Sequence, residues 1–307
     1  MHEQNEKSYL TSCDSNGSTD DAFYTPRFRE LHYLLPAILL PEKIIKKIKD
    51  DGLGDIELDK VPFNDKETFE MLWRGDTKGV FPFNSPQAIA IMQRLPTSYH
   101  LEDLMAVLCL ENRGERKNSP IKMYVAKKPW RYLTNMVVLY VKNSAVIDSL
   151  NYDELGDEDI DESARDILHD ILRDTCGLLF YQEQIEQIAM AIVGLSQSEA
   201  DSLCEAIVRN FPSRLILEEQ QMFFTISALG NNLSEYTADY LFKYIEKSAP
   251  YCLNKTITME CAALGYRLAW CKVHYRREFD AALCSLQGHL LDVLPPTLAA
   301  STLRFFA

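Results

Sequence analysis

The chain has 307 residues, 47% of them hydrophobic and 25% charged, a composition typical of a folded globular protein with a sizeable core. It contains no run of about 18 uncharged apolar residues and no basic N-terminal segment followed by an apolar one, so we expect neither a membrane span nor export and predict a cytoplasmic location. The formal net charge of −13 would repel nucleic acid overall, so any phosphate contact must come from a local basic patch.

The N-terminal part is predicted to be a disordered tail followed by one helix. Residues 1–24 are rich in Asn, Ser, Gly and Asp, and they carry too little apolar surface to offset the entropy of ordering. A short helical lead-in is predicted within 25–54, with Pro41 in its first turn and Gly52 just past its end. One face of this helix carries Ile44, Ile45 and Ile48.

Further helices are predicted before residue 112. Asn64 with Glu67 is typical of a capping box, and Ser85 followed by Pro86 is typical of an N-cap and first turn. We expect Gly75 to end the first of these helices. The apolar faces are Phe69, Leu72 and Trp73, then Ile89, Met92 and Leu95, then Leu101, Leu104 and Leu108.

The pattern changes between 112 and 162, where we predict an insertion with a small strand-containing part near 120–145. It opens with a basic, aromatic-containing stretch, continues through the apolar run 136–141, and ends in an acidic loop at 153–162. The apolar run is too short for periodicity to separate a strand from a helix.

Helices dominate again from residue 164 onward, so the predicted fold is mainly α. Ser196 with Glu199 is another capping-box pattern, and 262–279 is predicted to be one long, mostly buried helix. Residues 286–307 are expected to be a C-terminal extension. The apolar stripes are Ile185, Ile188, Ala189 and Ile192, then Ala238, Leu241, Phe242 and Ile245.

Three segments carry motifs in a recognisable order. The first runs from Leu58 through VPFNDKETFEML to GDTKGVFPFNS at Ser85, and the second is TCGLLFYQEQ, which ends at Gln184. The third joins Asn254, Lys255 and Thr256 to Tyr266, Lys272, His274 and Glu278. Over about residues 55–285, this order and spacing resemble the fingers of the C-family polymerases, the alpha subunit of bacterial DNA polymerase III. The resemblance implies a fingers-like helical domain that retains the motif residues Tyr181, Gln182, Glu183, Gln184, Asn254 and Lys255.

The departures from the family pattern bear on function. The resemblance implies that an arginine pair should meet the phosphates of the incoming nucleotide, but these positions are Cys204 and Glu205, and a glutamate would repel a triphosphate. The family histidine after Asn-Lys-Ser is Ile257, and its last catalytic aspartate falls on Leu31. We therefore expect the palm, with its carboxylates for two metal ions, to be missing.

One stretch could contact nucleic acid through phosphates and stacked bases, because it interleaves cations with Tyr124 and Trp130. The alternatives are a solvated face or pairing with the acidic loop at 153–162. The cations of this stretch are Arg113, Arg116, Lys117, Lys122, Lys127, Lys128 and Arg131.

Two other segments allow both a functional and a structural interpretation. Residues 181–184 could face substrate, or they could satisfy the free amide groups at a helix start. Residues 220–224 faintly resemble a sliding-clamp peptide, but 215–224 is also typical of a core helix, which is the interpretation we favour.

No catalytic residue, metal site or cofactor is predicted. The eight cysteines form no CxxC or zinc-ligand pattern and are expected to be reduced core residues. The histidines form no HExxH motif, and Glu199 with Asp201 lacks the converging oxygens of a divalent-ion site.

These observations predict a non-catalytic relative of the polymerase fingers that acts as a binding or scaffolding module in DNA replication or repair. The expected partner is another protein, a polymerase or a repair factor, with nucleic acid as a minor alternative and no membrane. The competing hypothesis is the fingers component of a split polymerase whose palm is on another chain, and a remnant without a selected role is a third.

Overall fold

The computed structural model describes residues 31–95, 99–113, 124, 160–208 and 214–293. Within these ranges the backbone is mainly helical, which confirms the predicted fold class. The extended pairing in this part of the chain is an isolated parallel bridge between Tyr181 and Leu253. The predicted tail at 1–24 and the predicted strands near 120–145 lie outside the described residues, apart from Tyr124 in the latter.

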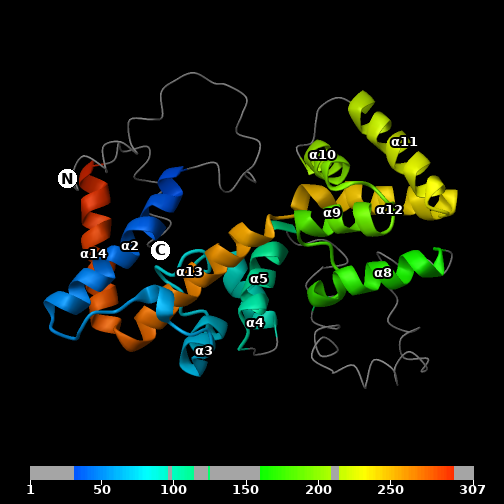
Figure 1. The fold of residues 1–307 in the computed structure, drawn as a ribbon. Helices are drawn as coiled ribbons and strands as arrows, with labels where there is room; N and C mark the ends of the chain where they lie inside the picture. Colours follow the sequence, from blue (N-terminus) through cyan, green and yellow to red (C-terminus); the bar gives the residue numbers. More distant parts are fainter. Residues whose placement is uncertain (1–30, 96–98, 114–123, 125–159, 209–213, 294–307) are drawn as a thin grey trace, which may run out of the picture.

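The helices surround two separate apolar cores (Figure 1). The first core is built by α2 (Leu31–Asp50), α3 (Lys66–Arg74), α4 (Pro86–Arg94), α5 (Leu101–Arg113), α13 (Lys255–His274) and α14 (Arg276–Val293). The second core is built by α8 (Glu162–Leu172), α9 (Gln182–Ala191), α10 (Gln197–Val208), α11 (Arg214–Gly230) and α12 (Glu235–Ser248). Short 3₁₀ turns lie at Leu58–Lys60, Arg173–Thr175 and Ala249–Tyr251.

The second core is built from one stretch of sequence, Ala164 to Cys252, whereas the first is built from residues on both sides of this stretch and from Cys176, Leu178, Phe180 and Tyr181 within it. Helices α2 to α5 precede the second core along the chain, and α13 and α14 follow it. Figure 1 shows α8 to α12 gathered at one side of the view, while α13 leads away from them to the side where α14 lies along α2. The second core is therefore an insertion between two halves of the first.

Local sequence explains where most of these helices start and stop. Ser85 accepts a hydrogen bond from the amide of Ala88 (2.9 Å), and Pro86 occupies the first turn of α4, as predicted. Gly75 ends α3 with a φ of 83°, a left-handed conformation that suits glycine. The N-cap of α3 is Asp65, whose carboxylate accepts from the amide of Thr68 (3.0 Å), so the prediction of Asn64 was wrong by one residue.

Two predicted helix boundaries were wrong. Helix α2 begins at Leu31, so Pro41 lies within it, because burial of Leu40 and Ile44 in the first core offsets the local cost of proline. The predicted helix 262–279 is two helices, and Tyr275 leaves helical geometry between them with φ −136° and ψ 49°. Apolar residues continue on both sides of this break, so periodicity does not reveal it.

The prediction that 215–224 is a core helix was also wrong in part. Phe224 and Ala228 are buried in the second core, but Leu215 and Met222 are 75% and 60% exposed. The reason is that α11 packs on α10 and α12 with one side only.

The other predicted faces are buried largely as expected. The stripes of α9 and α12 are fully inside the second core, and Ser196 and Glu199 form their capping box at α10.

Of the cysteines in the described residues, all are free and most are buried, while Cys284 is exposed. Burial raises the pKa of Cys271 to about 12, so its thiol stays protonated at neutral pH. Among the described helices, none is both long and apolar enough to cross a membrane.

Candidate functional site

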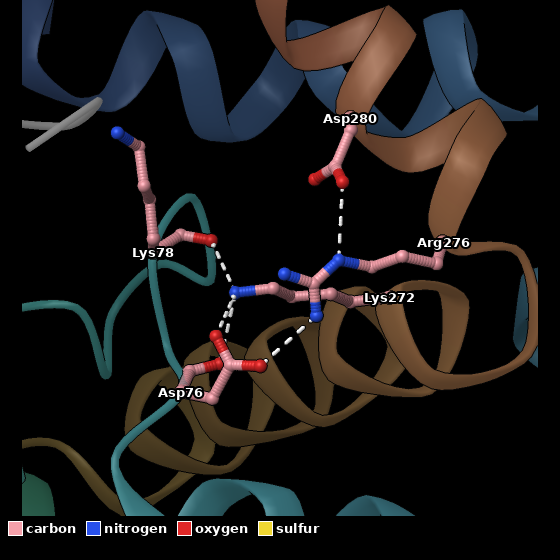
Figure 2. Close-up of polar contacts among 5 residues, drawn as sticks. All are labelled: Asp76, Lys78, Lys272, Arg276 and Asp280. Carbon is pink, nitrogen blue, oxygen red and sulfur yellow. Dashed lines mark hydrogen bonds and ion pairs between the residues drawn. The ribbon is translucent and has the colours of Figure 1, made fainter.

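The third motif segment anchors a loop of the first core through Lys272 (Figure 2). The Lys272 ammonium donates to the Asp76 carboxylate (2.8 Å) and to the backbone carbonyls of Asp76 (2.9 Å) and Lys78 (3.0 Å). Arg276 bridges the other oxygen of Asp76 and the carboxylate of Asp280, at 3.0 Å each. We call Asp76, Lys78, Lys272, Arg276 and Asp280 the Lys272 network.

Every proton of the Lys272 ammonium is used inside this network. The side chain is 2% exposed, and its three hydrogen bonds match the three donors of an ammonium group. Burial lowers the pKa of Lys272, and the adjacent Asp76 carboxylate offsets part of this effect. Lys272 therefore holds a loop in place and has no donor left for a phosphate.

A second contact of the same motif holds the start of α3. The Tyr266 hydroxyl accepts from the amide of Asp65 (2.8 Å) and donates to the carbonyl of Pro62 (3.2 Å). His274 Nε2 lies 3.0 Å from the Asp65 carboxylate, which also caps α3. Burial acts to raise the pKa of Asp65, but hydrogen bonds from Thr68 and His274 outweigh it and lower the pKa.

Gly265 lets the GVFPFNS turn lie directly on α13. A Cβ atom at Gly265 would come within 2.5 Å of the Phe83 ring and 2.9 Å of Pro82. The ring of Phe83 is fully buried in the first core, so it has little room to retreat. An isolated glycine inside a helical pattern is the sequence signal that could have predicted this close approach.

Gln184, in the second motif segment, is a structural side chain. Its carbonyl oxygen accepts from the amides of Phe180 (2.9 Å) and Tyr181 (3.0 Å), and its amide group donates to Thr175 (2.9 Å) and the carbonyl of Ile171 (3.2 Å). All four hydrogen-bonding positions of the side chain are occupied. The motif thus ties the start of α9 to the end of α8.

The retained residues of the second and third motifs meet at the junction of the two cores. Both carboxylate oxygens of Glu183 lie 3.0 Å from the amide of Lys255, at the N-terminus of α13. Asn254 caps the same helix by accepting from the amide of Ile257 (3.0 Å), and the Lys255 ammonium lies over the Tyr181 ring. A carboxylate at a helix N-terminus satisfies free amides and complements the helix dipole.

Backbone pairing completes this junction. The amide of Leu253 donates to Phe180 (2.9 Å), and the amide of Gln182 donates back to Leu253 (3.0 Å). The Gln182 side chain also reaches the carbonyl of Cys252 at 3.5 Å. The structure thus brings all six retained motif residues together: Tyr181, Gln182, Glu183 and Lys255 make contacts across the junction, while Gln184 and Asn254 fix the helix starts beside it.

Arg113 and Tyr124 are not available to nucleic acid as the sequence predicted. Arg113 is buried, donates to the carbonyl of Leu179 and lies 5.9 Å from the Phe180 ring. Tyr124 is fully buried, and its hydroxyl donates to Asp103 (2.8 Å). Both side chains pair with buried partners, which the basic character of the segment hid. The other predicted cations lie outside the described residues: Arg116, Lys117, Lys122, Lys127, Lys128 and Arg131.

The two positions that replace the expected arginine pair lie on α10, beside α9. Cys204 is buried with its thiol 3.7 Å from the carbonyl of Gln182, and Glu205 is exposed. Burial raises the pKa of nearby Glu186, and the charges of Asp201 and Glu183 raise it further. Helices α9 and α10 therefore share an acidic face, a feature that the sequence pattern did not indicate.

The carboxylates of this acidic face are not grouped as metal ligands in the part of the chain that the structure describes. Within the ranges that the structure describes, no group of three or more His, Cys, Asp or Glu side chains is placed to hold a metal ion. Glu199 is used in the capping box of α10, and Asp201 accepts from Gln197 at 2.6 Å.

The helical fold and the three motif segments, in this order along the chain, are those expected of a polymerase fingers domain. The model of the bacterial DNA polymerase III alpha subunit finger domain matches residues 40–230, and the chain belongs to this family.

Relatives from several bacteria agree with this assignment. The chain is similar to the DNA polymerase III subunit alpha of Staphylococcus epidermidis, with 30% identity over 243 residues, 79% of this chain and 20% of the relative. The subunit of Thermus aquaticus is 30% identical over 245 residues, 80% of this chain and 18% of the relative. That of Deinococcus radiodurans is 29% identical over 271 residues, 83% and 18% of the two chains. The chain thus spans about a fifth of the length of these relatives.

Proposed function

We propose that this chain is a fingers-family module that works by binding another protein of DNA replication or repair, and that it does not hold the triphosphate of an incoming nucleotide. One observation carries this proposal: the positions expected to be an arginine pair are the buried Cys204 and the exposed Glu205. Neither side chain can donate to a phosphate at neutral pH in the way that a guanidinium does.

The charges around these two positions point in the same direction. Glu183, Glu186 and Asp201 approach one another closely enough for the two neighbours to raise the pKa of Glu186, after the larger effect of burial. A triphosphate placed here would meet like charges, and like charges at short range are unfavourable even in water. The acidic face thus favours exclusion of nucleotide.

The retained motif residues do not argue for nucleotide binding either. Lys272, Gln184 and Glu183 each bond to other parts of this chain, and these contacts hold helices and loops in place. Retention of these residues is therefore explained by the fold alone. This is consistent with a module whose frame is kept while its substrate contacts have changed.

A nucleotide titration tests the proposal. The chain would be titrated into a fluorescent deoxynucleoside triphosphate with Mg²⁺, next to a Glu205→Arg variant and a Glu235→Arg control, which makes the same charge change at an exposed position on α12. We expect no saturable binding by the wild-type chain up to about 1 mM, a dissociation constant that corresponds to roughly 4 kcal/mol of binding free energy. Saturable binding by the wild type would contradict the proposal.

The competing function is a fingers component that acts with a palm on another chain. The extent of the family match, residues 40–230, favours this alternative because much of the fingers frame is present. The test is primer extension by a palm-bearing polypeptide, with Mg²⁺ and nucleotides, in the presence and absence of this chain. Extension that depends on the chain would establish the alternative, and a stable complex without extension would support the binding module.

Nucleic-acid binding remains a subordinate proposal for the basic stretch. If Lys127 and Lys128 contact phosphates, DNA affinity should fall steeply with salt, and the Lys127→Glu, Lys128→Glu double variant should bind less at every salt concentration. A filter-binding series that detects no binding even at low salt would remove this proposal.

A further inference from the structure

Helix α11 presents an apolar stripe to the outside of the second core. The stripe consists of Leu215 (75% exposed), Met222 (60%), Ile226 (61%) and Leu229 (47%), and Phe223 beside it is 39% exposed. The opposite side of the helix carries the buried Phe224 and Ala228 and packs on α10 and α12. Single exposed apolar residues are ordinary on a protein surface, but four on one side of one helix are not.

The spacing of the stripe suits a second helix. Leu215, Met222 and Leu229 are seven residues apart, and Ile226 lies four residues after Met222. This is the heptad pattern by which one helix packs along another, with knobs of one side chain set into holes of the partner. An extended peptide would not need such spacing, and an amphipathic helix would.

The charge beside the stripe indicates which kind of partner helix would bind there. From Leu215 to the end of α11 at Gly230 the sequence has two carboxylates and no Lys or Arg. Both of them, Glu218 and Glu219, are exposed, within the first turns of the stripe. A partner with cations at the edges of its own apolar stripe would place opposite charges against these glutamates.

We propose that the outer face of α11, formed by Leu215, Met222, Ile226 and Leu229 with Glu218 and Glu219, docks an amphipathic helix of another protein whose apolar stripe is flanked by Lys and Arg. This inference names a partner class for the binding function proposed above and rests on that function. The surface concerned is separate from the α9 and α10 positions that decide nucleotide binding.

Charge also favours this partner over two alternatives, a second copy of the chain and nucleic acid. A second copy of the chain would bring another Glu218 and Glu219 to the contact and a further net charge of −13, so charge repulsion opposes self-association through the stripes. Nucleic acid would be repelled by the same glutamates.

The test is a binding measurement on the full chain with a defined probe. The probe is a fluorescein-labelled synthetic helix about three heptads long, with Leu at the seam and Lys at the flanking positions. Its control has the same seam but Glu in place of Lys. We expect saturable anisotropy binding of the Lys probe and at least roughly tenfold weaker binding of the Glu probe, because flanking charges set partner choice.

Variants of the chain locate the contact. Met222→Ser with Ile226→Ser should weaken binding of the Lys probe by roughly tenfold or more, as expected for anchor residues at the centre of an interface. Met259→Ser on α13, a residue 47% exposed, is the matched control and should bind as the wild type does. All of these side chains are exposed, so circular dichroism should show an unchanged fold.

Several outcomes would overturn the inference. These are no binding of the Lys probe, equal binding of the two probes, equal loss in the Met259→Ser control, or a concentration-dependent dimer that the Met222→Ser, Ile226→Ser variant abolishes. None of these results bears on the nucleotide titration, so failure of this inference and failure of the proposed function remain distinguishable.

Discussion

The two cores differ in how their polar groups are used. At the first core, the motif residue Lys272 points inward, and its ammonium makes three hydrogen bonds to a single loop. At the second core, carboxylates lie on the outer side of α9 and α10, and the charges of Asp201 and Glu183 add to the effect of burial in raising the pKa of Glu186. The comparison indicates that the buried charge of Lys272 serves the fold, while the carboxylates of α9 and α10 lie close enough together to raise the pKa of Glu186.

The largest effect should come from removing the Lys272 ammonium. Lys272→Met keeps the length of the side chain but leaves the carbonyls of Asp76 and Lys78 without their buried donor. We expect a loss of about 3 kcal/mol in the free energy of unfolding, measured by urea denaturation. Arg276→Gln, whose parent side chain is 55% exposed, should cost less than about 1 kcal/mol. Equal effects of the two changes would refute the special role of the buried donor.

The second prediction concerns Gln184, the most highly connected polar side chain of the junction. Gln184→Ala removes four hydrogen bonds around the start of α9 and should cost about 2 kcal/mol. Gln187→Ala is the control, because Gln187 is exposed on the same helix, and should change stability by no more than about 0.5 kcal/mol. Thermal unfolding of both variants measures the difference, and a neutral Gln184→Ala would mean that the junction does not depend on this side chain.

A smaller loss is expected where the loop touches α13. Gly265→Ala favours the helix by about 1 kcal/mol but overpacks Phe83 and Pro82, which typically costs about 1–3 kcal/mol. We expect net destabilisation of about 1 kcal/mol. Gly288→Ala on α14 meets no atom within 4 Å and should instead stabilise by about 0.5–1 kcal/mol. If both alanines stabilise the protein, the close packing at Gly265 is not a constraint.

The two cores should also respond oppositely to pH, through Asp76 and Glu186. Burial acts to raise the pKa of Asp76, but hydrogen bonds from Lys272 and Arg276 lower it below its ordinary 3.8. A lowered pKa in the folded state means that this carboxylate stabilises the fold above pH 3.8, and that the contribution is lost as the pH falls through the folded pKa. Asp76→Asn should therefore be destabilising at neutral pH and progressively less so on acidification, as denaturation curves at a series of pH values would reveal.

Glu186 gives the smallest effect, with the opposite sign. Its pKa is raised above the ordinary 4.5 by burial and then by Asp201 and Glu183, so its charged form destabilises the fold. This penalty is present above the folded pKa and is lost as the pH falls to 4.5. Glu186→Gln should stabilise the chain at neutral pH by about 0.5 kcal/mol, a figure that allows for solvent screening, and should have no effect once the carboxyl is protonated. Destabilisation at neutral pH would contradict the acidic face described for α9 and α10.

Sequence predicted what is decided by near neighbours along the chain. Ser85 and the Ser196–Glu199 pair cap their helices as expected, because capping needs only a few adjacent residues. The break at Tyr275 and the exposure of Met222 were missed, since both depend on which helices lie alongside. A run of apolar residues does not reveal which side of a helix will be covered by another helix.

The candidate site was predictable to a similar extent. The family motifs singled out Lys272 and Gln184, and the replacement at Glu205 was visible from the sequence. Their roles were not, because the partner of Lys272 lies 196 residues away and the burial of Arg113 depends on Phe180. Long-range pairing of this kind leaves no local pattern to read.

The insertion of the second core between two halves of the first has a consequence for synthesis on the ribosome. The buried apolar residues of the second core all lie between Ala164 and Cys252, so this core can form once residue 252 has been made. The earlier helices must wait, because Tyr266 and Lys272, which meet partners 201 and 196 residues before them, are translated only after the second core. Nascent chains stalled before α13 should therefore contain a folded later half and an unfinished earlier half, the reverse of the order in which the two were translated.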